Sequence, residues 1–276
     1  MDNKIAPRSF FDGPKPRVIA HRGSSGTAPE NTMEAFRQAL AHGADILEMD
    51  VHLTADGVPV VIHDETVERT TDGSGLVRHM TFEQLKHLDA GYRFTADGGI
   101  TFPYRGTGIT IPSFEEVLQC FQGVPINFEV KADDDRLLDS LVALLTRYGR
   151  LRYGDVFVAG FKNRFLRKLR RRLPLAFVGN SRLEIANLVL AAKLRCKFLF
   201  FGRGDAFQPK PRAGRLDIVT PATVNMAHRL GLEVHVWTID EESEMTRLLD
   251  MGVDGLFTNF PERMRRLIDS RGKQQR

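Results

Sequence analysis

The chain has 276 residues, of which 42% are hydrophobic and 27% charged, proportions typical of a soluble globular protein. Its formal net charge of +4 suits an anionic small molecule but is too small to indicate a nucleic-acid partner. The N-terminal residues lack an apolar segment and charges interrupt the most apolar window, 183–201, so we expect neither a signal peptide nor a transmembrane helix. Cys120 and Cys196 have no metal-type spacing, and we expect both to be buried free thiols in a reducing, cytoplasmic environment.

The predicted elements begin after a loose N-terminal arm, residues 1–16. A short buried strand is expected over 17–21, and a helix follows it. We expect Asn31 to cap this helix, because Glu34 three residues later would complete a capping box.

The next element is a hairpin that gathers polar side chains. A strand over 44–51 runs toward Asp56-Gly57, a dipeptide that tolerates positive φ and favours a tight turn. If these two residues form the turn, Asp50 lies directly opposite His63, and Glu48 shares a strand face with Asp50. Carboxylates suit hard divalent cations and histidine exchanges protons near neutral pH, so the hairpin predicts a metal-assisted acid–base site. The alternative is a set of solvated side chains on an exposed hairpin.

A polar, glycine-rich segment over about 64–112 interrupts the pattern, and we interpret it as an insertion with one short helix at 81–88. Beyond it, helices and strands alternate. Helices are expected over 113–121, 135–148, 162–173, 183–194, 222–230, 242–251 and 262–270, and strands over 125–131, 155–161, 175–179, 217–220, 234–239 and 255–258.

Eight strands alternating with helices predict an α/β protein, a single (β/α)8 TIM barrel over residues 17–270, with the small insertion after the hairpin of the second strand. Residues 271–276 are expected to form a C-terminal tail. An open, doubly wound sheet is the alternative fold.

Polar residues gather at the carboxyl ends of the predicted strands, where (β/α)8 barrels build their active sites. His21 and Arg22 end the first strand, and Glu129 and Lys131 share one face at the end of the third. Unpaired buried acids are costly, so these carboxylates suggest a bound cation. The alternatives are an ordinary Glu129–Lys131 ion pair and, for Trp237 after the seventh strand, a packing role. Three other histidines are interpreted as structural or surface residues: His52, His228 and His235.

Several spaced motifs occur in order along the chain, between residue 18 and about residue 268. They are His21-Arg-Gly, Pro29-Glu-Asn-Thr-Met-Glu-Ala-Phe36, Glu48-Met-Asp50, Asp56-Gly57, Val60-Val-Ile-His-Asp64, Phe128-Glu-Val-Lys131, Val236-Trp-Thr238, Gly252-Val-Asp-Gly255 and Thr258-Asn-Phe-Pro261. Together they resemble the glycerophosphodiester phosphodiesterase family, and their agreement is far more specific than any single motif.

The resemblance implies a (β/α)8 barrel that hydrolyses glycerophosphodiesters to glycerol 3-phosphate and an alcohol. By this resemblance, His21 and His63 would be the acid–base pair, and Glu48, Asp50 and Glu129 would bind one divalent cation, Mg²⁺ or Ca²⁺. Arg22 and Lys131 would bind the phosphate, and Trp237 would line the substrate groove. These roles agree with the chemistry, because a phosphodiester needs its charge neutralised and protons moved at the attacking and leaving oxygens. Attack by water and attack by the substrate's own glycerol hydroxyl, through a cyclic phosphate, are both compatible with the sequence.

The stretch from Leu188 to Phe207 interleaves apolar side chains with lysines and arginines. Such a segment after the fifth strand can lie on an anionic membrane surface. It resembles the lysophospholipase D-like branch of the family, which has a long apolar segment here. Lysophospholipids, reached through peripheral membrane contact, are therefore the alternative substrates.

Two interpretations from other classes are weaker. A non-catalytic barrel that binds a phosphate ester would be expected to have lost at least one site residue, and all are present. A metal-dependent sugar isomerase is disfavoured because the pairing of Arg22 with Lys131 suits a phosphate.

Overall fold

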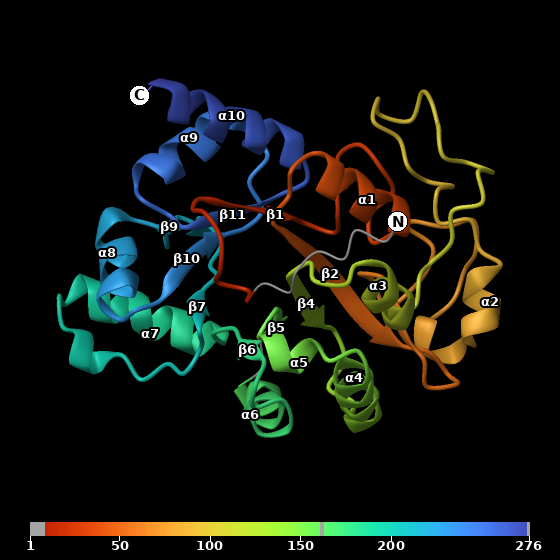
Figure 1. Cartoon of the computed structure of the whole chain (residues 1–276), viewed down its shortest axis with the longest axis horizontal. Coiled ribbons are helices and arrows are strands. Elements are labelled where there is room, and N and C mark those ends of the chain that lie inside the picture. Colours follow the sequence, from red (N-terminus) through yellow and green to blue (C-terminus); the bar gives the residue numbers. More distant parts are fainter. Residues whose placement is uncertain (1–8, 161–162, 275–276) are drawn as a thin grey trace.

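The structure, a computed structural model, describes residues 9–160 and 163–274. Its centre is a nearly closed barrel of eight parallel strands (Figure 1). In their order round the barrel they are β6 (Phe177–Val178), β5 (Val156–Ala159), β4 (Ile126–Val130), β2 (Ile46–Leu53), β1 (Arg17–Ala20), β11 (Gly255–Thr258), β10 (Glu233–Val236) and β7 (Ala206–Phe207). Between β6 and β7, the Asp205 N–H donates to the Val178 carbonyl at 2.9 Å. The predicted single (β/α)8 barrel is confirmed.

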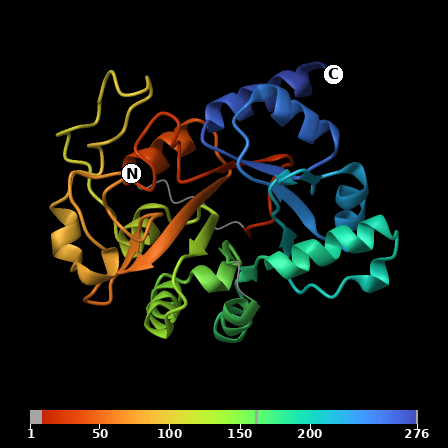
Figure 2. The ribbon, with the colours of Figure 1, turned by 180° about the vertical axis from the view of Figure 1, so that it is seen from behind.

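Helices cover the outside of this sheet, as Figures 1 and 2 show from opposite sides. They are α1 (Met33–Ala41), α3 (Phe114–Cys120), α4 (Asp135–Arg147), α5 (Arg150–Tyr153), α6 (Asn163–Arg172), α7 (Arg182–Lys193), α8 (Pro221–Arg229), α9 (Glu242–Asp250) and α10 (Pro261–Gln274). Because α10 continues through residues 271–274, the tail predicted there was wrong; residues 275–276 lie outside the described part of the chain. No helix in the described ranges combines the length and apolar character needed to cross a membrane. Both cysteines are free thiols, but Cys120 is exposed and Cys196 half-buried, so their expected burial was wrong.

The start of α1 differs from the prediction. The Thr32 hydroxyl, not Asn31, accepts a hydrogen bond from the Ala35 N–H at 3.2 Å. Asn31 has a φ of +57°, a left-handed conformation that asparagine tolerates, and its side-chain amide donates to Asp50 Oδ2 at 3.0 Å. Asn31 therefore supports a buried carboxylate of β2 instead of capping the helix.

The hairpin after β2 has a longer loop than predicted. β2 pairs with β3 (Pro59–Val61) so that Val51 faces Val61, and the Ile62 N–H donates to the Asp50 carbonyl. The predicted pairing of Asp50 with His63 was therefore wrong by one residue. The cause is a three-residue loop, 55–57, which is closed by hydrogen bonds between Thr54 and Val58 and ends at Gly57 with a φ of +82°.

The sixth barrel strand was also misplaced by the sequence. It is β7, whose Ala206 and Phe207 are fully buried and pair with β10, while the segment predicted as a strand over 217–220 lies outside the barrel. There, β8 (Arg212–Ala213) and β9 (Leu216–Asp217) form an exposed antiparallel hairpin. The two-residue length of β7 left no periodic pattern to read.

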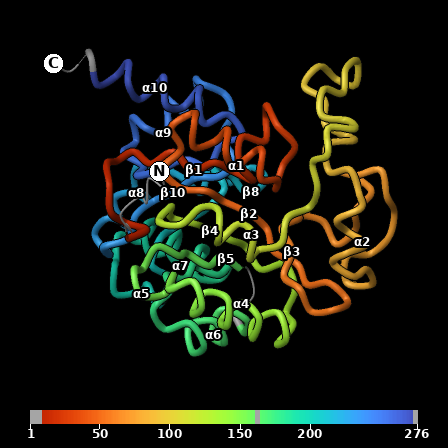
Figure 3. Tube along the Cα trace, turned by 45° about the vertical axis from the view of Figure 1, so that its right-hand side comes forward, coloured from red at the N-terminus to blue at the C-terminus, as the bar shows by residue number. Residues whose placement is uncertain are grey.

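The insertion after the hairpin lies beside the barrel (Figure 3). It contains a short 3-10 helix, η1 (Val77–His79), and the helix expected over 81–88, which is α2 (Phe82–Lys86) and begins with a capping box of Thr81 and Gln84. Its apolar side chains pack on Val60 and Ile62 of the hairpin. The hairpin therefore anchors the insertion to the barrel.

Residues 9–16 are not the loose arm that was expected. Phe10 is fully buried with Phe157 and Phe257 among the strands, and its N–H donates to the Gly154 carbonyl at 2.7 Å. This segment covers the amino ends of the strands and leaves their carboxyl ends accessible. The rest of the predicted arm, residues 1–8, lies outside the described residues.

Candidate active site

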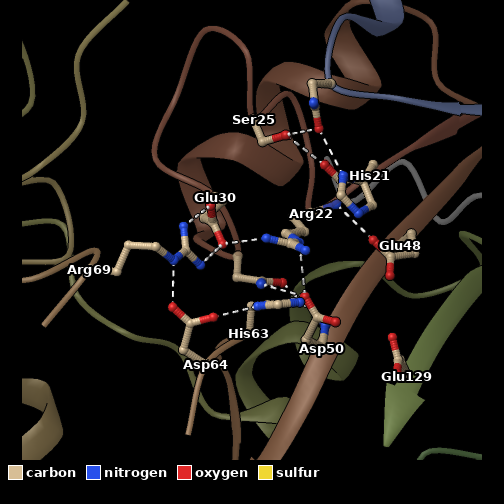
Figure 4. A network of polar contacts seen from close by, with 12 residues as sticks. His21, Arg22, Ser25, Glu30, Glu48, Asp50, His63, Asp64, Arg69 and Glu129 are labelled. Atoms are coloured by element: carbon tan, nitrogen blue, oxygen red, sulfur yellow. Dashed lines mark hydrogen bonds and ion pairs between the residues drawn. The ribbon is translucent and has the colours of Figure 1, made fainter. Parts of the chain in front are cut away.

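All the side chains that the sequence singled out meet in one cavity of about 280 Å³ at the carboxyl ends of the strands. They are His21, Arg22, Glu48, Asp50, His63, Glu129, Lys131 and Trp237. The acids come from β2 and β4, and the two histidines reach the same space from the ends of β1 and of the hairpin (Figure 4). The other three histidines make contacts elsewhere: His228 with Asp254, His235 with Glu233, and His52 with the His63 carbonyl.

His21 is held in one tautomer by a chain of hydrogen bonds. Asn259 Nδ2 donates to Asp240 Oδ2 at 2.6 Å, so the amide oxygen of Asn259 must face His21, 2.8 Å from Nδ1. Nδ1 of His21 therefore carries a proton. Burial, together with the neighbouring charge of Arg22, lowers the pKa of His21. The neutral ring consequently has its unprotonated nitrogen, Nε2, free for proton transfer.

His63 is oriented by the next residue along the chain. Its Nδ1–H donates to Asp64 Oδ1 at 2.6 Å. Although partial burial opposes it, hydrogen bonds from Arg69 and His63 lower the pKa of Asp64 to about 2, so this carboxylate only accepts. Nε2 is thus the nitrogen of His63 that can exchange a proton, as it is in His21.

Arg22 adopts a left-handed backbone conformation, with a φ of +56°. This turn directs its N–H to Glu48 Oε2 at 2.8 Å, while its guanidinium reaches Glu30 at 2.9 Å and Asp50 at 3.2 Å. The side chain is consequently fixed at the edge of the cavity, where a phosphate oxygen can accept from it.

An ammonium group lies among the carboxylates. Lys131 Nζ is 2.9 Å from Asp50 Oδ1 and 2.8 Å from Glu129 Oε2. Burial disfavours the charged amine, but Asp50 and Glu129 outweigh this effect and raise the pKa of Lys131. In the same way, burial would raise the pKa of Asp50, but the charges of Lys131 and Arg22 hold it below the usual value.

For Glu48, the charge and hydrogen bond of Arg22 offset the effect of burial only in part. This residue is only 6% exposed, and in the described part of the chain it accepts one hydrogen bond, from Arg22, and forms no ion pair. Burial, followed by the nearby charge of Asp50, raises the pKa of Glu48 well above its usual range. A divalent cation relieves this kind of cost, and three carboxylates are the oxygen ligands that Mg²⁺ and Ca²⁺ prefer.

The donor set therefore fits a divalent cation in its chemistry, although not in its present arrangement. Among residues 9–160 and 163–274, no group of three His, Cys, Asp or Glu side chains is placed to hold a metal ion. The ammonium of Lys131 lies between two of the three acids instead. Binding of a cation would require that side chain to move.

Trp237 follows β10 and forms a wall of the cavity. Its Nε1–H donates to the Gln208 carbonyl at 2.8 Å, and Lys210 Nζ lies 4.8 Å from the centre of one ring. The indole is thereby fixed with one side against the cavity and a cation beside it.

Sequence reasoning missed a supporting network around these residues. Arg69, from the insertion, donates to both Glu30 and Asp64, and so connects the partner of Arg22 with the partner of His63 (Figure 4). Asp64 directly follows His63, and Glu30 belongs to a recognised motif, so both gave a local signal. No motif indicated Arg69, because one of the two carboxylates that it joins, Glu30, lies 39 residues away in the sequence.

Comparison with known proteins gives a consistent result. Residues 21–263 match the model of the glycerophosphoryl diester phosphodiesterase family. The chain is 33% identical over 263 residues to a glycerophosphodiester phosphodiesterase of Caldanaerobacter subterraneus, covering 94% of this chain and 100% of that one. A crystal structure from Silicibacter pomeroyi matches with a TM-score of 0.76 and 29% identity over 96% of each chain. An Oleispira antarctica phosphodiesterase in complex with the product sn-glycerol-3-phosphate matches with a TM-score of 0.72 and 26% identity over 92% of this chain and 97% of that one.

Proposed function

The chain belongs to the glycerophosphoryl diester phosphodiesterase family and is a phosphoric diester hydrolase, and we propose that it cleaves glycerophosphodiesters by metal-assisted catalysis with two histidines. The observation that carries this proposal is the pair of imidazoles in one cavity. In both His21 and His63, Nδ1 donates to a fixed oxygen and Nε2 is left for proton transfer. The product would be glycerol 3-phosphate, with an alcohol as the leaving group.

Arg22 and Lys131 would bind the nonbridging oxygens of the phosphate. Both are cations that line the cavity, and both now pair with Asp50. Glu48, Asp50 and Glu129 would hold one divalent cation, Mg²⁺ or Ca²⁺, which when bound polarises the phosphate and neutralises the acids. The two basic side chains then supply charge-assisted hydrogen bonds as negative charge develops on the phosphate.

The two histidines would divide the proton transfers between them. One ring takes the proton of the attacking hydroxyl, which belongs to water or to the glycerol of the substrate itself. The other ring gives a proton to the leaving alkoxide, so that the alcohol departs neutral. The carboxylate of Asp64 stabilises the positive charge that His63 carries in its doubly protonated form.

A second candidate activity is release of the head group from lysophospholipids at a membrane surface, as a lysophospholipase D. The supporting observation is a group of exposed apolar side chains between Leu188 and Phe207. Leu194, Phe198 and Phe201 are 59%, 87% and 59% exposed, and lysines and arginines alternate with them. This combination favours peripheral contact with anionic lipids, which we propose for this stretch.

One assay tests both candidates. Release of choline and of glycerol 3-phosphate or lysophosphatidic acid is measured from glycerophosphocholine and from lysophosphatidylcholine, each with Mg²⁺, Ca²⁺ or EDTA. Turnover of glycerophosphocholine that EDTA abolishes is expected. Preference for the lysolipid would favour the second activity, whereas silence on both substrates would favour a barrel that only binds phosphate esters.

A further inference from the structure

A second cavity, of about 790 Å³, lies beside the catalytic one. One wall is a single face of α7, on which Arg182, Ile185, Ala186, Val189, Leu190 and Lys193 recur at helical spacing. The facing wall comes from the β8–β9 hairpin and the residues after it, including Leu216 and Ile218. Figure 2 shows α7 as a long teal helix at the outer edge of the barrel. The space is an apolar groove rimmed by cations, and we call it the α7 groove.

The α7 groove adjoins the catalytic cavity. Arg182, Ile185, Lys210 and Trp237 line both spaces. A molecule whose phosphodiester lies among the catalytic side chains can therefore extend past Trp237 without leaving the protein surface. This continuity distinguishes the groove from an isolated apolar patch.

The side chains of the groove select the kind of group that extends into it. Its two walls carry aliphatic side chains, and Leu190 and Leu216, one from each wall, are 51% and 44% exposed, which is costly unless an apolar group covers them. Arg182, Lys193, Lys210 and Arg212 at the rim disfavour a cationic tail and suit a molecule that carries a phosphate anion. An uncharged hydrocarbon chain attached to a phosphodiester meets both requirements.

We propose that the α7 groove binds the single acyl chain of a lysophospholipid whose phosphodiester lies in the catalytic cavity. This inference rests on the proposed phosphodiesterase activity and names the substrate class for which the site is extended. It does not require a membrane, because the chain binds to the protein in a dissolved molecule. The groove thus makes the enzyme prefer a diester with one acyl chain over the same diester without it.

The test is a chain-length series. Choline release is measured from glycerophosphocholine and from lysophosphatidylcholines of increasing acyl length, all below the concentration at which they form micelles. Each methylene buried from water is expected to raise kcat/KM by up to about fourfold, until the groove is filled. Turnover of every substrate with no dependence on chain length would overturn the inference and leave the proposed function standing. Absence of turnover on every substrate would overturn both.

Variants locate the effect. Leu190→Asp and Leu216→Asp each place a charge on one wall of the groove. We expect each variant to lose at least about tenfold in its preference for the longest lysolipid, measured as the kcat/KM for that lysolipid divided by the kcat/KM for glycerophosphocholine. Leu183→Asp is the matched control, since Leu183 is on the same helix and 56% exposed but does not line the groove. An equal loss in all three variants would contradict the proposal. The proposal would also be contradicted if the groove variants kept the dependence on acyl-chain length but changed their mass in solution. That result would mean that a second copy of the protein occupies the groove.

Discussion

Arg69 Nε lies 2.5 Å from Asp64 Oδ2, an ion pair at the start of the insertion that holds the residue orienting His63. The same guanidinium donates to Glu30 through both terminal nitrogens, at 2.7 and 2.8 Å, and Glu30 in turn accepts from Arg22. Burial alone would raise the pKa of Glu30, but the hydrogen bonds and charges of Arg69 and Arg22 outweigh this effect and lower it. One side chain of the insertion thus holds the partners of a proposed acid–base histidine and of a proposed phosphate ligand (Figure 4).

Arg69 should accordingly matter for catalysis more than for stability. Its side chain is 47% exposed, so Arg69→Ala should leave the fold intact while releasing Asp64 and Glu30. We expect kcat on glycerophosphocholine to fall by about 10- to 100-fold, as is common when a residue that orients catalytic groups is lost. Arg69→Lys should recover only part of this, because an ammonium cannot bond both carboxylates in the same geometry.

The control for that measurement is Arg78→Ala. Arg78 is an exposed arginine of the same insertion whose nearest acid, Glu65, is 4.0 Å away. It should keep the wild-type kcat, and an equal loss in both variants would show that Arg69 supports the insertion and not the site.

Glu48→Gln should make the metal-free protein more stable and less responsive to cations. Because burial raises the pKa of Glu48, its contribution to stability is fully present below the unfolded carboxyl pKa and is lost as the pH rises toward the folded value. Removing the charge should raise the free energy of unfolding near neutral pH by about 1 kcal/mol. Thermal melts with EDTA and with excess Mg²⁺ or Ca²⁺ provide the measurement. A cation-induced rise in Tm that is as large in the variant as in the wild type would rule Glu48 out as a ligand.

The amino end of the barrel should show the opposite dependence on pH. Arg17 is 2% exposed, and its guanidinium donates to both oxygens of Glu233 at 2.9 Å. Burial alone would raise the pKa of Glu233, but hydrogen bonds from Arg17 and His235 hold it well below its usual value. The stabilisation is therefore complete above the unfolded pKa of about 4.3 and is lost as the pH falls below it.

Urea denaturation of the wild type and of Glu233→Gln tests this ion pair. Near neutral pH the variant should unfold with about 3 kcal/mol less free energy, because the charge of Arg17 stays buried without its partner. Between about pH 6 and about pH 3.5 the wild type should lose more free energy of unfolding than the variant. Parallel losses would mean that the pair contributes nothing to the acid sensitivity of the fold.

The barrel and the residues at its strand ends could be predicted from sequence for a physical reason. Alternation of strands and helices determines the topology, and the topology brings distant strand ends such as Glu48 and Glu129 into one cavity. The hairpin register was missed because the Thr54 side chain closes a loop one residue longer than the dipeptide suggested. Asn31 was misjudged and Arg69 missed because their partners Asp50 and Glu30 are distant in the sequence and are reached only in the folded chain.

The central claim is that two histidines move protons in a phosphodiester cleavage. The most direct test is release of glycerol 3-phosphate from glycerophosphocholine by the wild type, His21→Ala and His63→Ala, each shown to be folded by circular dichroism and thermal melting. Each variant should lose a factor of about 10² to 10⁴ in kcat. A folded variant that keeps turnover within about tenfold of the wild type would contradict the assignment of that histidine.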